Sequence, residues 1–193
     1  LPVLRAINCM LASLLLLCVT ATNLHAQTLP EGYELHPLGG GLNGRAAAVH
    51  AAGDDIYYGG IFTEAYNALD GTTPTELVPN TNFIARWDGS QWHPLGQGTN
   101  NSVLAIAHAN DGSIYVGGLF REVTQADGST LTVNRIARFK SGQWSAVASG
   151  LNGYVNSLAV VERAAGGHDL YVGGDFTTAT DSSGTKTVNH LAK

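Results

Sequence analysis

The sequence beyond residue 26 contains no cysteine. Both cysteines of the chain, Cys9 and Cys18, lie in the first 26 residues. This absence excludes disulfide bonds, thiolate metal sites and a cysteine nucleophile from everything that follows. Any fold in that part must be held together by its hydrophobic core alone.

Charged residues are also scarce, at 13% of the chain, and basic residues are the scarcer kind. Beyond residue 26, 9 basic residues stand against 15 acidic ones. A mildly acidic surface argues against nucleic acid or an anionic membrane as the partner. Hydrophobic residues reach 44%, and Gly occurs 24 times, which favours many short strands joined by tight turns over disorder.

No apolar run is long enough to cross a bilayer, which needs about 20 residues. The longest, residues 9–20, follows the single charge of Arg5 and precedes a small, polar stretch that ends at Ala26. This pattern predicts a cleaved signal peptide at 1–26, followed by a linker at 27–35. The protein is then secreted or held at the cell surface, without a transmembrane segment in the mature chain; the alternative is an uncleaved anchor helix.

A tetrapeptide recurs three times, as YYGG at 57–60 and as YVGG at 115–118 and 171–174. Extending the alignment outward gives three repeats, 36–92, 93–144 and an incomplete 145–193. The first two close with NFIARWDGSQW and NRIARFKSGQW, and the three open with HPLGGGLNG, HPLGQGTNN and SAVASGLNG. A period near 50 residues is typical of propellers and solenoids.

The second repeat predicts four antiparallel strands, at 103–109, 113–120, 134–140 and 143–147, joined by Asn-, Asp- and Gly-containing turns. Four short strands per repeat predict an all-β protein, a β-propeller of four-stranded blades. In this interpretation Tyr and Val of YVGG pack between neighbouring blades. The paired glycines lie where crowding leaves no room for a side chain.

A hydrophobic strand that ends in Gly-Gly, with a Trp about 26 residues later (Gly118 to Trp144), resembles the kelch motif. The fuller phrasing, YVGGDFTTA with N-x-[IL]-A-R-[WF]-x-x-x-x-W, resembles the repeats of fungal cortical cell-polarity marker proteins and of similar bacterial secreted proteins. The resemblance covers 36–193 and implies a kelch-like propeller, with little information on function. About two and a half blades cannot close a ring of 4–8. We therefore interpret the chain as the N-terminal fragment of a longer protein.

The chemical motifs predict no catalytic, cofactor-binding or metal-binding residue. GGGLNG (39–44) matches a dinucleotide fingerprint, but no helix is expected after it, so it is a turn. His50 and His108, like His36 and His93, share a repeat position in this alignment, which predicts that each pair lies in adjacent blades and not in one site. The recurring cations Arg86, Arg138 and Lys193 suggest a repeated salt bridge or stem packing. Asn82, Asn134 and Asn189 are interpreted as tying the preceding loop to backbone groups.

Three long segments, 63–81, 121–133 and 177–188, are expected to be loops on one face of the ring, where an unknown protein or carbohydrate ligand would bind. Two function classes remain. The first is an exported, non-catalytic propeller module for binding or structural roles. The second is the N-terminal part of a propeller enzyme, of lyase or glycosidase type, whose catalytic residues lie in other blades. A copper-radical oxidase is disfavoured because it needs a thioether-linked cysteine.

Overall fold

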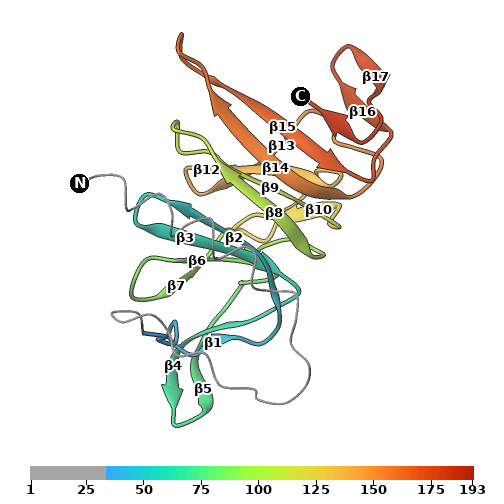
Figure 1. Cartoon of the computed structure of the whole chain (residues 1–193). Coiled ribbons are helices and arrows are strands. Elements are labelled where there is room, and N and C mark those ends of the chain that lie inside the picture. Colours follow the sequence, from blue (N-terminus) through green and yellow to red (C-terminus); the bar gives the residue numbers. More distant parts are fainter. Residues whose placement is uncertain (1–33) are drawn as a thin grey trace, which may run out of the picture. The chain divides into compact units, whose positions relative to one another are not determined.

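The computed structural model describes residues 34–193, and Pro37–Lys193 form one compact unit. Every regular element of that unit is a β-strand, and all pairs are antiparallel, which confirms the all-β prediction (Figure 1). The predicted signal peptide and most of the predicted linker lie outside the described residues. Within residues 34–193 there is no helix with the length and apolarity that a membrane span requires.

Each repeat forms one antiparallel meander in which strands follow one another in chain order. The strands predicted in the second repeat are confirmed, to within a few residues at their ends. The first sheet is β2(Ala46–Ala52), β3(Asp55–Gly60), β6(Ile84–Trp87), β7(Trp92–Pro94). The second is β8(Val103–His108), β9(Ile114–Gly118), β12(Ile136–Lys140), β13(Gln143–Ala146). The third has three strands, β14(Val155–Glu162), β15(His168–Gly174), β18(Leu191–Ala192).

The first strands of the three sheets lie next to one another. In the second sheet, β8 packs against β2 on one side and against β14 on the other (Figure 1). The space between the first and second sheets is filled by a fully buried cluster that includes Ile84, Val103 and Val116. Val155 fills the equivalent space between the second and third sheets, where it packs with Ile136. Neighbouring repeats therefore contact each other face to face in the same way.

The first glycine of each Gly-Gly pair makes this contact possible. A methyl group placed on Gly59 would lie 2.5 Å from Val103 Cγ1, and one on Gly117 would lie 2.3 Å from Val155 Cγ1. Real Cβ atoms do not approach so closely. The predicted crowding is thus confirmed, and it comes from the first strand of the following repeat.

The second glycine has a different neighbour, in its own sheet. A methyl group on Gly118 would lie 2.1 Å from the carbonyl oxygen of Ser102, at the β-bulge where β8 enters the sheet. The Gly118 N–H donates to the carbonyl of Arg135, whose φ of +79° is unusual for a residue with a side chain. Phe83 and His190 adopt the same conformation in the other repeats. In each repeat, the N–H of the second glycine therefore donates to the carbonyl of a residue in the left-handed conformation.

The segments expected to be long loops are instead β-hairpins, and that prediction is wrong. They contain β4(Ala65–Asp70) with β5(Thr73–Val78), β10(Glu122–Thr124) with β11(Thr130–Thr132), and β16(Thr178–Asp181) with β17(Gly184–Thr187). Each hairpin pairs with the segment that enters its own repeat: β1(Gly41–Leu42) with β4, Thr99 with Val123, and Leu151 with Ala179. This pairing provides backbone hydrogen-bond partners for the hairpins, which are rich in Thr and Asp. In the second repeat, Val123 and Val133 are buried as a result.

A tryptophan on the fourth strand closes the core of each complete repeat. Trp92 and Trp144 are both 3% exposed. Their indole N–H groups donate to the carbonyls of Leu38 and Leu95, at 3.1 and 2.9 Å. Leu38 and Leu95 occupy the same place in the HPLG openings, so the two tryptophans bind equivalent acceptors. The strand, its indole and the repeat opening form one packed unit.

Candidate functional site

The recurring cations, on or just after the third strand of each sheet, mostly form ion pairs, as the salt-bridge interpretation expected. Arg86 forms an ion pair with Asp55 at 2.8 Å, and Lys193 forms one with Asp169 at 2.9 Å. In the second repeat the acid is replaced by Ser113, and the Arg138 Nε donates to Ser145 instead. Two of the three positions therefore carry a partly exposed ion pair, which is worth little stability by itself.

Two of the three recurring asparagines bind backbone groups as expected, and these groups lie in the following repeat. Asn82 donates to the carbonyl of Gln97, and Asn134 donates to the carbonyl of Ser149. Each acceptor lies 15 residues later, in the opening of the following repeat. These side chains therefore connect one repeat to the next, a role that a local interpretation of the motif could not reveal.

His50 and His108 do lie in adjacent sheets, but the prediction that they do not share one site is wrong. His50 Nε2 and His108 Nδ1 are 2.8 Å apart, and the rings lie 5.0 Å apart between β2 and β8. The two residues are not equivalent: His50 pairs with Tyr57, whereas the partner of Tyr115 is Ala107. One residue of offset turns a strand side chain to the opposite face, so the two histidines point at each other.

The burial of His50 beside His108 predicts that stability depends on pH. Burial, and then the neighbouring His108, lower the pKa of His50 below its ordinary value of 6.5. The unfolded chain then binds a proton more readily than the folded one, so stability is lost as pH falls below about 6.5. The melting-temperature difference between wild type and His50→Gln should shrink from pH 7.5 to pH 5.5. A difference that stays constant or widens contradicts this prediction.

Two further motifs have structural roles. In the GGGLNG stretch, residues 39–40 form a turn and the next two form β1, and a methyl group on Gly40 would lie 2.2 Å from the Ala68 carbonyl oxygen. His93 contacts Asp88, and Asp111 contacts Lys140. Among residues 34–193, no three His, Cys, Asp or Glu side chains gather in a way that would hold a metal ion.

A polar groove lies between the second and third repeats, beside the hairpin β10–β11. It measures about 280 Å³ and is lined by Arg121, Arg135, Tyr154, Asn100 and Asn101. The Arg135 guanidinium carbon sits 4.8 Å from the centre of the Tyr154 ring, which contributes a cation–π contact. We refer to Arg121, Arg135 and Tyr154 as the arginine–tyrosine groove.

The groove carries positive charge in an acidic protein. Neither Arg121 nor Arg135 forms an ion pair with an acidic side chain among residues 34–193. Burial, and then the adjacent charge of Arg121, lower the pKa of Arg135, while Tyr154 acts in the opposite direction. The nearby acid Glu122 accepts a hydrogen bond from Asn100 at 3.3 Å. Two close guanidinium groups without acidic partners favour an anionic ligand.

The fold of the backbone places these three side chains. Asn100 Oδ1 accepts the backbone N–H groups of Arg121 and Glu122, so it fixes the start of the hairpin. Arg135 projects from the left-handed position described above, and strained residues of this kind are frequent at functional sites. One sequence signal marks this position, because it varies as Phe83, Arg135 and His190 while its neighbours repeat.

Comparison with known proteins identifies no relative of this chain. No family model, no curated protein and no solved structure matches the chain.

Proposed function

We propose that the chain is part of a kelch-like β-propeller that serves as an exported, non-catalytic binding module. Its arginine–tyrosine groove would bind a carboxylate-bearing saccharide. Three meanders that present β2, β8 and β14 side by side, each packed face to face on the next, support the propeller arrangement. Export is inferred from residues 1–26 alone.

The groove carries the binding proposal. Paired guanidinium groups offer bidentate donors to carboxylates, and the Asn100 and Asn101 amides can bond to sugar hydroxyls. The groove lies at the end of the sheets where both the hairpins and the connections between repeats emerge, because each hairpin pairs with such a connection. Ligands are commonly bound by variable segments held on a rigid scaffold.

The test uses oligogalacturonate as the acidic probe and a maltooligosaccharide of equal length as the neutral one. Calorimetry should detect binding of the acidic probe, weakened by salt. Arg135→Ala should reduce its affinity about 10- to 100-fold, because a hydrogen bond to a charged group contributes about 1.5–3 kcal/mol. Arg163→Ala removes the same charge from another surface and should leave affinity unchanged.

Equal binding of both probes, or equal loss in both variants, would show that the groove is not a site for anions.

The tip of the hairpin, 127–129, should tolerate replacement without loss of melting temperature. Shortening the whole 121–133 segment should not be tolerated, because Val123 and Val133 belong to the core.

A further inference from the structure

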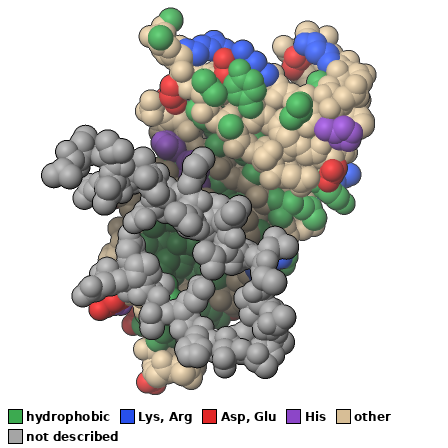
Figure 2. All heavy atoms as spheres, in the orientation of Figure 1, with side chains coloured by type: hydrophobic (Ala, Val, Ile, Leu, Met, Phe, Trp, Pro, Cys, Tyr) green, Lys and Arg blue, Asp and Glu red, His purple; other side chains and the backbone are tan. Residues whose placement is uncertain are grey.

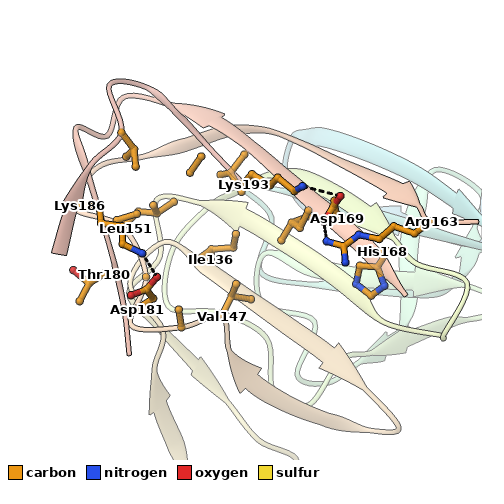
Figure 3. Close-up of a pocket in the computed structure, with 17 residues that line it drawn as sticks. Ile136, Val147, Leu151, Arg163, His168, Asp169, Thr180, Asp181, Lys186 and Lys193 are labelled. Atoms are coloured by element: carbon orange, nitrogen blue, oxygen red, sulfur yellow. Dashed lines mark hydrogen bonds and ion pairs between the residues drawn. The ribbon is translucent and has the colours of Figure 1, made fainter. Parts of the chain in front are cut away.

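A second cavity lies in the third repeat, where the sheet has three strands. It measures about 450 Å³ and is lined by Ile136, Val147, Leu151, Asp181 and Lys193 among others. Figure 3 shows Ile136 and Val147 between the Lys186–Asp181 ion pair on one side and the cluster of Arg163, Asp169 and Lys193 on the other. We call this cavity the third-sheet groove. Its floor is apolar and its rim is charged.

The complete repeats show what fills the equivalent place. Val147 corresponds to Leu38 and Leu95, because all three carbonyls accept the N–H of the residue three positions later. In the first two repeats these carbonyls also accept the indole N–H of Trp92 and Trp144. The groove is therefore the position that a fourth-strand tryptophan occupies elsewhere in this chain.

A second contact supports the same assignment. The Trp144 backbone N–H donates to Gln125 Oε1, and the Trp92 N–H donates to Asn67 Oδ1. Gln125 and Asn67 lie two residues after Val123 and Ala65, and Asp181 holds the corresponding place after Ala179. The Asp181 carboxylate thus lies where a backbone N–H of an incoming strand would bind.

The outer face of the third sheet is a separate exposed surface, on the side where each earlier sheet packs against the sheet that follows it. Ile84 and Ile136 pair with the first glycines of their sheets and are 0% and 2% exposed, whereas the equivalent Leu191 is 72% exposed. Tyr115 is 7% exposed and its equivalent Tyr171 is 43% exposed. Figure 2 shows hydrophobic side chains reaching the surface next to basic and acidic ones over the third sheet.

We propose that the third-sheet groove is a receptor for a tryptophan-bearing β-strand of the kind this chain has at residues 143–146. The strand would pair with β18, place its indole over Ile136 and Val147, donate the indole N–H to the Val147 carbonyl, and donate a backbone N–H to Asp181. Addition of a strand to a sheet edge is a recurrent mode of peptide binding.

One residue departs from the pattern and sharpens the test. Ala148 replaces the glycine found at Gly96, where a methyl group would lie 2.8 Å from Trp144 Nε1. The incoming indole must therefore shift slightly. Ala148→Gly should remove this obstruction and tighten binding several-fold.

The experiment adds a peptide with the sequence of residues 139–147, FKSGQWSAV, carrying fluorotryptophan, to the full chain. Fluorine NMR at millimolar concentration should show a shifted, broadened signal, which a peptide with alanine for tryptophan would not displace. Asp181→Ala should weaken binding about 10-fold. Asp127→Ala is the matched control, because each of the two aspartates accepts the backbone N–H of the serine two residues later in a turn.

No change in the fluorine signal, or changes that are equal in wild type, Ala148→Gly and Asp181→Ala, would overturn the proposal. Sedimentation provides a second outcome. Self-association that the peptide does not inhibit would mean that a second copy of the chain, and not a tryptophan strand, covers this face.

Discussion

Replacing Trp144 by alanine should lower the free energy of unfolding by about 3–5 kcal/mol, as expected for a buried aromatic residue that leaves a cavity. Trp144 is 3% exposed and packs against Phe139, with the ring centres 4.9 Å apart. The substitution also removes the indole hydrogen bond to the Leu95 carbonyl, which keeps the Gly98 N–H as its other donor. Urea denaturation followed by circular dichroism measures the difference.

Two further variants separate the causes of that loss. Trp144→Phe keeps most of the ring but removes the indole N–H, and should cost about 0.5–1.5 kcal/mol, the net contribution of one hydrogen bond, because the Leu95 carbonyl still accepts the Gly98 N–H. Val161→Ala changes a side chain that is 50% exposed and should stay within about 0.5 kcal/mol of wild type. A cost for Trp144→Ala no greater than that for Val161→Ala would contradict the role of Trp144 in the core.

The strands of the repeat were predictable because two independent signals agree there. β-branched and aromatic residues alternate in stretches such as 113–118, and Asn, Asp and Gly mark the turns between strands. The repetition of YVGG then identified equivalent positions without any contact information. The same signals failed for 63–81, 121–133 and 177–188, where turn-forming residues dominate. Each hairpin there also pairs with a distant segment, as Val123 does with Thr99, 24 residues earlier (123 − 99 = 24).

The histidine pair shows a different limit. Alignment on the Gly-Gly motif makes His50 and His108 look equivalent, because the hairpin turns before the motif differ in length and the alignment cannot register this. Strand pairing places Val49 opposite Tyr58 and Ile106 opposite Val116, which shifts the two histidines by one position. A shift of one residue decides the face of a strand, so contacts between sheets need the register as well as the repeat.

The arginine–tyrosine groove depends on side chains that do not repeat. Tyr154 of the third repeat stands where the first two repeats have Arg45 and Ser102. Arg135 of the second repeat stands where the first and third have Phe83 and His190. The repeat therefore predicts where variable side chains gather, since it fixes the backbone that presents them. It does not predict that Arg135 from one repeat stacks on Tyr154 from the next, because that contact depends on how successive sheets pack.

Alanine substitutions in the Gly-Gly motif should produce losses that differ strongly between equivalent positions. The methyl group of Gly118→Ala would meet the Ser102 oxygen at 2.1 Å and two further backbone atoms within 3.1 Å. These backbone atoms cannot rotate away from the added methyl group, so the β-bulge between Val103 and Ala105 must deform. We expect a loss of about 3 kcal/mol, at the upper end of overpacking costs, measured by urea denaturation.

Gly117→Ala and Gly173→Ala test packing between repeats at one repeat position. At Gly117 the methyl group would press on the fully buried Val155, whereas at Gly173 it would meet only the Ser157 Oγ at 2.5 Å, with Leu191 next at 3.6 Å. Because the serine hydroxyl can rotate, Gly173→Ala should cost much less than the roughly 1–3 kcal/mol of Gly117→Ala. Val155→Ala should partly rescue Gly117→Ala, with a coupling energy of about 0.5–3 kcal/mol. Additive effects of the two substitutions would mean that Gly117 and Val155 do not share the contact through which the second and third sheets pack.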